Sequence, residues 1–61
     1  MDKELLEKWV VDKKKYISDC LTKIQEMLAE NDFSGVKCYT QFVEQAAIEA
    51  TTYELMVEIF G

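Results

Sequence analysis

The two cysteines, Cys20 and Cys38, are the most nucleophilic side chains of this 61-residue sequence. Cysteine catalysis needs a nearby base that holds the thiol as a thiolate, and the sequence contains no histidine. The two thiols lie 18 residues apart, which matches no zinc-ligand spacing. Because both lie on apolar stripes, we interpret them as small core residues. We therefore expect no enzymatic activity, no metal and no cofactor.

The one basic cluster of the sequence is the run Lys13, Lys14 and Lys15. Nucleic-acid binding depends mainly on neutralising phosphates, and arginine is the commonest reader of base edges. The chain carries a net charge of -5 and no arginine, so nucleic acid suits it poorly as a partner. We interpret the cluster as a solvated helix face, with the Lys13 ammonium near Glu49. An RNA-binding helical-hairpin dimer that uses Lys13 to Lys15 is an alternative.

Three glutamates, Glu44, Glu54 and Glu58, share one flank of the second half of the chain. Five acidic residues and one lysine give residues 31–61 a net charge of -4, whereas seven acidic residues and six lysines give residues 1–30 only -1. This asymmetry favours a basic protein partner, because complementary charge steers the encounter. We therefore predict an acidic contact surface at these three glutamates. Solubility alone is the competing explanation.

A helix is expected over residues 2–30, because apolar residues recur there with the helical period and no residue type breaks the pattern. The expected stripe consists of Leu6, Val10, Ile17, Leu21, Ile24 and Leu28, widened on one flank by Trp9, Tyr16, Cys20 and Met27. Charged residues occupy the opposite face.

The second half of the chain is less clear-cut. Residues 36–42 alternate as in a strand and are rich in β-branched and aromatic types. The segment 44–50, however, is rich in Ala and Glu, which favour helix. A helical stripe also runs unbroken through it: Tyr39, Phe42, Val43, Ala46, Ala50, Tyr53, Met56, Val57 and Phe60. We predict a second helix over about 35–60. An α+β fold with a short strand at 36–42 is the alternative.

The cluster of turn-forming residues at 31–35 joins the two helices. A connection this short makes them antiparallel neighbours. The whole chain, residues 1–61, is therefore expected to form one domain, an all-α antiparallel two-helix hairpin.

A hairpin of this size is marginally stable alone. Burial contributes roughly 90 kcal/mol, and ordering the chain costs about the same. We therefore predict a homodimer that forms a four-helix bundle. The apolar residues left outside the hairpin contact are the expected protein interface, with Trp9 as its main anchor: Leu5, Trp9, Ile48, Leu55 and Ile59.

These observations predict a small acidic regulator or inhibitor, of the kind that phages and plasmids encode, which binds a larger and basic protein. A structural or chaperone hairpin that shields a helical partner is a second alternative. No apolar run approaches the roughly 18 residues that a membrane span needs, so no membrane contact is expected. The acidic first residues do not resemble a signal peptide, and we expect a cytoplasmic protein.

Overall fold

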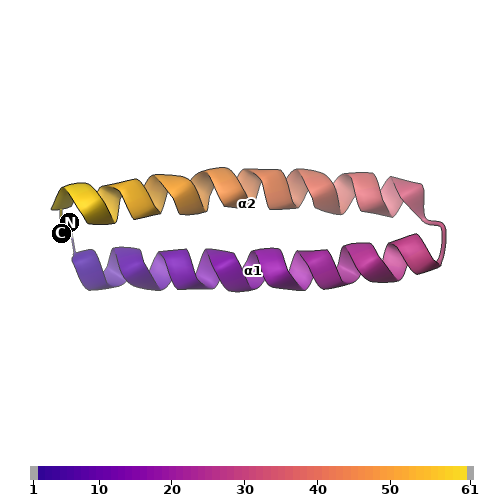
Figure 1. The fold of residues 1–61 in the computed structure, drawn as a ribbon, viewed down its shortest axis with the longest axis horizontal. Helices are drawn as coiled ribbons and strands as arrows, with labels where there is room; N and C mark the ends of the chain where they lie inside the picture. The colour runs from indigo at the N-terminus through magenta and orange to yellow at the C-terminus, as the bar shows by residue number, and fades with distance from the viewer. Residues whose placement is uncertain (1, 61) are drawn as a thin grey trace.

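The chain folds into two long antiparallel α-helices joined by a tight turn (Figure 1). This computed structural model describes residues 2–60, with α1 at Lys3–Ala29 and α2 at Phe33–Phe60. The predicted all-α hairpin is confirmed. The alternative strand at 36–42 is wrong, because these residues form early turns of α2. Their apolar members at helical spacing pack on α1, and that contact outweighs their strand propensity.

The side chain and carbonyl of Asp2 cap the N-terminus of α1. The Oδ1 atom of Asp2 accepts a hydrogen bond from the backbone N–H of Glu4 at 2.9 Å, and the Asp2 carbonyl accepts one from Leu6 at 3.1 Å. A carboxylate at this position also interacts favourably with the positive end of the helix dipole. Asp2 is therefore the N-cap of α1. The predicted range 2–30 had instead made Asp2 the first helical residue.

The first helix ends in a hydrogen-bond pattern that needs one left-handed residue. The N–H of Asp32 donates to the carbonyl of Met27 at 2.8 Å, and the N–H of Asn31 donates to the carbonyl of Leu28 at 3.1 Å. This pair of bonds is a Schellman motif. Asn31 supplies the left-handed residue with a φ of 58°, which asparagine tolerates better than most other types.

The second helix starts at Phe33, two residues earlier than predicted, because Asp32 caps it. The Asp32 Oδ1 atom accepts a hydrogen bond from the Gly35 N–H at 3.0 Å. The predicted turn at 31–35 is therefore too long, and Gly35 lies within the helix. A Cβ atom at Gly35 would stand 2.6 Å from both Asp32 Oδ2 and Met27 Sδ. Position 35 thus favours glycine for close approach and not for a left-handed backbone.

The two helices contact each other along a seam with a seven-residue repeat. The seam residues of α1 follow at alternating spacings of four and three: Leu6, Val10, Lys13, Ile17, Cys20, Ile24 and Met27. Those of α2 are Val36, Tyr39, Val43, Ala46, Ala50, Tyr53 and Val57. All of them are buried or half-buried, and their spacing is that of an antiparallel coiled coil.

Two leucines predicted for the centre of the α1 stripe, Leu21 and Leu28, are exposed instead. A stripe read at 3.6 residues per turn drifts by about 20° per heptad from one that repeats every 3.5 residues. The helices contact each other along the seam that repeats every 3.5 residues. In the half near the turn, Cys20 and Met27 therefore point toward α2 in place of Leu21 and Leu28. The same shift leaves Phe42 of α2 exposed.

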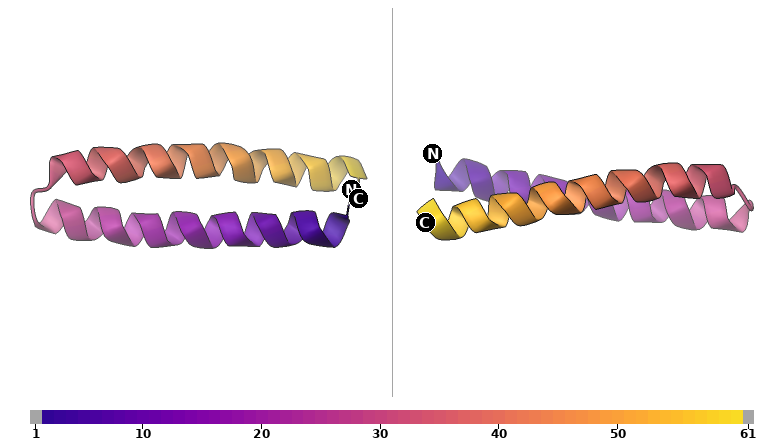
Figure 2. Two further views of the ribbon diagram at one scale, coloured as in Figure 1. Left: turned by 180° about the vertical axis from the view of Figure 1, so that it is seen from behind. Right: turned by 90° about the horizontal axis from the view of Figure 1, so that it is seen from above.

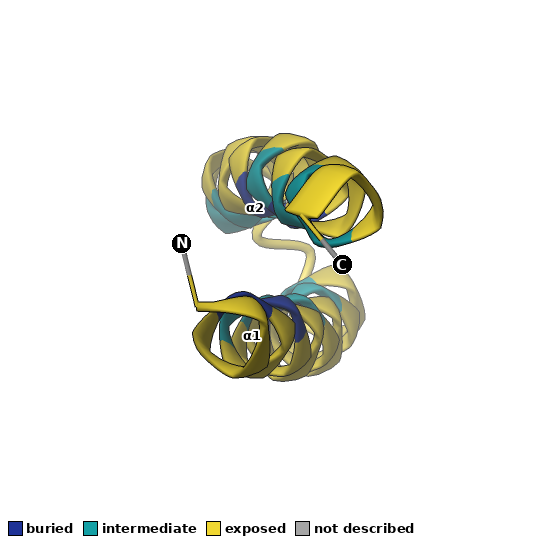
Figure 3. Cartoon of the chain, turned by 90° about the vertical axis from the view of Figure 1, so that its left-hand side faces the viewer, coloured by how far each residue is buried: buried dark blue, intermediate teal, exposed yellow. Residues whose placement is uncertain are grey.

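The buried residues of α2 are both small. Ala46 and Ala50 are buried, as the sequence predicts for the middle of this helix, and Leu6 is completely buried near the open end. Seen end-on, the buried residues of each helix face the other helix (Figure 3). Seen from above, the two helices cross at a shallow angle near the middle of their length (Figure 2). Small side chains at the crossing allow the two backbones to approach each other.

The hairpin is elongated, with extents of 44, 14 and 11 Å along its principal axes. Its accessible surface of 4576 Å² exceeds the roughly 4,100 Å² expected for a compact protein of this mass. Neither α1 nor α2 has a segment that is both long and apolar enough to cross a lipid bilayer. The fold therefore leaves much surface for contacts with other molecules.

Candidate protein-interaction surface

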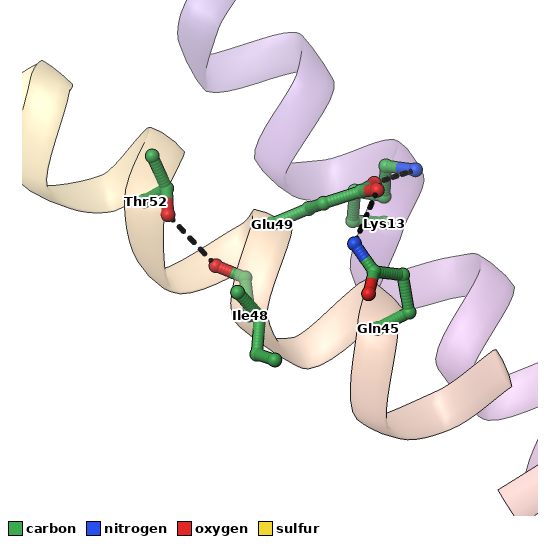
Figure 4. A network of polar contacts seen from close by, with 5 residues as sticks. All are labelled: Lys13, Gln45, Ile48, Glu49 and Thr52. Atoms are coloured by element: carbon green, nitrogen blue, oxygen red, sulfur yellow. Dashed lines mark hydrogen bonds and ion pairs between the residues drawn. The ribbon is translucent and has the colours of Figure 1, made fainter. Parts of the chain in front are cut away.

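A charged network crosses the middle of the seam. The Lys13 ammonium of α1 forms an ion pair with the Glu49 carboxylate of α2, as the sequence predicts (Figure 4). Gln45 Nε2 donates a second hydrogen bond to Glu49 at 3.3 Å. The Lys13 Nζ atom also lies 6.0 Å from the centroid of the Tyr16 ring, at the outer limit of a cation–π contact. These contacts link α1 and α2 on one side of the seam.

The network shifts the pKa values of both charged partners in the direction that favours their charged forms. The hydrogen bond from Lys13, followed by that from Gln45, lowers the pKa of Glu49 from its ordinary 4.5. The same Lys13–Glu49 hydrogen bond is the main cause that raises the pKa of Lys13 above 10.5. The pair is therefore fully charged near neutral pH.

A second ion pair lies on the opposite edge of the seam, where Lys14 Nζ is 3.2 Å from Glu54 Oε1. Consecutive helical residues point about 100° apart, which is why Lys13 and Lys14 reach different edges of α2. Two lysines of the run are thus held by carboxylates of the same chain. Lys15, an exposed residue, forms no ion pair within residues 2–60.

A shallow groove of about 380 Å³ lies beside the Lys14–Glu54 pair, toward the open end of the hairpin. We call it the acidic groove. Its apolar lining is formed by Val10, Val11 and Val57. Its charged lining is formed by Glu7, Lys14, Glu54 and Glu58. The groove thus combines an apolar centre with a rim of three carboxylates and one ammonium.

The groove contains two of the three glutamates predicted as an acidic contact surface, Glu54 and Glu58. Glu44 lies ten residues before Glu54, about 15 Å further along α2, and outside the groove. The sequence interpretation missed Glu7, because it considered only acidic residues of α2. The antiparallel pairing that brings Val10 close to Val57 was the available signal for it.

The five residues predicted as an apolar interface come from both helices and differ in exposure. Trp9 is half-buried and its ring packs against Tyr53, with centroids 5.4 Å apart. Leu5 lies on α1 with 41% of its surface exposed. The other three are on α2 and are exposed by 54% or more: Ile48 at 62%, Leu55 at 54% and Ile59 at 73%.

Both cysteines are free thiols, but their surroundings differ. Cys20 is buried in the seam, as predicted for a small core residue. The prediction that Cys38 is also a core residue is wrong: Cys38 is exposed, because it lies between the seam positions Val36 and Tyr39 on the outer side of α2. Residues 2–60 bring together no group of three His, Cys, Asp or Glu side chains that could hold a metal ion.

Comparisons of this chain with models of protein families, with curated proteins and with solved structures find no match.

Proposed function

We propose that this chain is a non-enzymatic cytoplasmic regulator that binds a basic amphipathic helix of a larger protein. The acidic groove is the observation that supports this proposal. Its apolar centre and its carboxylate rim match a helix with one apolar stripe flanked by lysine or arginine. The net charge of -5 adds a long-range attraction for such a partner.

The apolar and the charged residues of the groove are expected to contribute to binding in different ways. Val11, which is 64% exposed, is the apolar side chain that a partner would cover most completely. Burying a side chain of this size contributes about 1.5–3 kcal/mol and slows dissociation. Glu58 forms no ion pair among the described residues, and Glu7 contacts only the exposed Lys3, at 4.0 Å. These two carboxylates are therefore the ones best placed to steer the partner.

The RNA-binding alternative loses support from the ion pairs of Lys13 and Lys14. Each of these lysines would have to leave a carboxylate of its own chain before it could neutralise a phosphate. Phosphate neutralisation is the main source of affinity for nucleic acid. We therefore favour a protein partner over RNA.

A peptide-binding titration tests the proposal. The probe is a synthetic amphipathic peptide of about 18 residues, or five helical turns, made of leucine on one stripe and lysine elsewhere. We expect it to bind the wild-type chain, and a leucine–glutamate peptide of the same pattern to bind at least about tenfold more weakly. Equal affinity for the two peptides would contradict the proposal.

Two matched substitutions locate the binding site. Val11→Glu is expected to weaken binding of the leucine–lysine peptide at least about tenfold, because it places a charge in the apolar centre. Ile48→Glu is the control, because Ile48 is 62% exposed, similar to the 64% of Val11, but lies outside the groove. Equal losses from both substitutions would show that the peptide binds elsewhere.

A further inference from the structure

The face of α2 that points away from α1 carries a second apolar stripe. Its members are Ile48, Thr52, Leu55 and Ile59, which we call the outer stripe. Their spacings of four, three and four residues repeat the pattern of the seam. Ile48 lies midway between the buried Ala46 and Ala50, so it points to the opposite side of the helix.

The distribution of charge sets α2 apart from α1. Only 5 of the 28 residues of α2 are charged, against 11 of the 27 residues of α1. No charged residue lies on the outer stripe. A helix that is apolar on two opposite faces is typical of a central helix with neighbours on both sides. The hairpin supplies a neighbour on one side only.

The hydroxyl groups of Thr51 and Thr52, near Ile48, both donate hydrogen bonds within the helix. Thr52 Oγ1 donates to the Ile48 carbonyl at 3.0 Å (Figure 4), and Thr51 Oγ1 donates to the Ala47 carbonyl at 2.9 Å. With these hydrogen bonds inside the helix, covering the stripe costs little in lost bonds to water. A shallow hollow of about 320 Å³ between Ala47, Ile48, Thr51 and Thr52 offers space for a partner side chain.

We propose that the outer stripe pairs with the outer stripe of a second copy of this chain, antiparallel and with two-fold symmetry. In the register with the best apolar match, Ile48 faces Ile59 of the second copy, and Thr52 faces Leu55. The two α2 helices then lie side by side, with an α1 helix on each outer flank. This arrangement is a layer of four helices, whereas the sequence had suggested a four-helix bundle.

Charge favours a second copy at this face over other faces of the hairpin. Two chains of net charge -5 repel each other, so they approach best along a surface without carboxylates. In the proposed register Glu58 faces Thr51 of the second copy, so no carboxylate meets another directly across the contact. None of the four outer-stripe residues lines the acidic groove, although Glu58 lines the groove and also borders this contact.

The size of the contact makes the dimer weak. Residues 47–60 of the two copies overlap over about 20 Å, along helices about 10 Å wide. The contact therefore covers a few hundred Å² per copy, below the roughly 800 Å² of a standard stable interface. We expect a dissociation constant of the order of 100 µM.

Sedimentation equilibrium of the full chain tests the dimer, from about 20 µM to about 1 mM. The average mass of the wild-type chain is expected to rise from 7.1 kDa toward twice that value. Ile48→Glu is expected to remain at the monomer mass throughout, and the matched variant Val11→Glu to associate like the wild type. A wild-type chain that stays monomeric at about 1 mM would overturn the proposal, and so would loss of association in Val11→Glu alone.

A mixing experiment tests the register. Ile48→Glu and Ile59→Lys are each expected to be monomeric, because two copies of either variant would bury unpaired charges. An equimolar mixture of the two is expected to associate, because position 48 of one copy faces position 59 of the other. The mixture then has one opposite-charge pair and one intact pair of isoleucines. Failure of the mixture to associate, with the wild type dimeric, would overturn this register.

Discussion

Lys13 of α1 and Glu49 of α2 form an ion pair at the midpoint of a seam that is otherwise almost wholly apolar. Gln45 donates a hydrogen bond to the same carboxylate. A single polar contact in an apolar seam can fix the register of two helices, because any other register leaves its charges unpaired. The pair therefore contributes to the specific alignment of the hairpin.

The pKa shifts of this pair predict how stability depends on pH. Folding lowers the pKa of Glu49, so its contribution is present above the unfolded value of about 4.5 and is lost as pH falls through the lower folded value. Folding raises the pKa of Lys13, so its contribution is present below about 10.5 and is lost as pH rises beyond it. Thermal unfolding, followed by circular dichroism, should show a declining Tm at both extremes.

Two substitutions distinguish the contribution of Glu49 to the fall in Tm at acid pH from the general effect of removing a negative charge. Glu49→Gln should reduce the decline of Tm below about pH 4.5, because the titrating group is gone. Glu44→Gln removes an exposed carboxylate of the same helix that forms no ion pair among the described residues, and it is the control. Identical declines of Tm at acid pH in the wild type and Glu49→Gln would show that the pair does not couple folding to pH.

The cap of α2 predicts a graded effect at Asp32. Asp32→Ala removes the acceptor of the Gly35 N–H and should destabilise the fold by about 1 kcal/mol, or a fall in Tm of roughly 4–8 °C. Asp32→Asn keeps a side-chain oxygen and should cost much less. Thermal unfolding measures both variants. Equal losses would mean that the charge of Asp32, and not its hydrogen bond, stabilises the turn.

The close approach of the helices predicts a contrast between two neighbouring alanines. Ala46 is buried and Ala47 is exposed. Ala46→Leu should therefore overpack the seam and destabilise it by about 1–3 kcal/mol, whereas Ala47→Leu should be nearly neutral. Urea unfolding at low micromolar concentration measures both. A stabilising effect of Ala46→Leu would mean that the helices are further apart than this structure places them.

The open end of the hairpin depends on Leu6, which is completely buried. Leu6→Ala should cost about 2–5 kcal/mol. A chain of this length has a total stability of roughly 3–9 kcal/mol, so the substitution removes a large part of it. Leu5→Ala, at a neighbouring exposed position, is the control and should cost far less. The fluorescence of Trp9 during urea unfolding reports both, because its ring packs on α2 only in the folded hairpin.

The sequence was sufficient to predict the fold but not the rotation of each helix. Apolar periodicity identified both helices and their antiparallel pairing. It placed Leu21 and Leu28 in the core, because a 3.6-residue stripe and a 3.5-residue seam diverge only gradually over several turns. The length of the turn was also mispredicted. The side chain of Asp32 caps the start of α2, so the helix begins two residues before Gly35, where the sequence had suggested its start.

The candidate site was predicted only in part, because it is formed by residues from both helices. Glu54 and Glu58 follow from the charge pattern of α2 alone. The role of Glu7 and Val11 depends on the register that places α1 beside them. The covering of Trp9 by Tyr53 likewise depends on side-chain packing across the seam, which helical periodicity does not specify.

We propose that the carboxylates of the acidic groove attract a basic helix. This proposal is tested most directly by the association rate of a fluorescently labelled leucine–lysine peptide, measured by stopped flow at several ionic strengths. We predict a rate that falls at least about fivefold between about 20 and 200 mM salt, with a shallower fall for the double variant of Glu7→Gln and Glu58→Gln. An association rate that stays constant over this range in the wild-type chain would contradict this proposal.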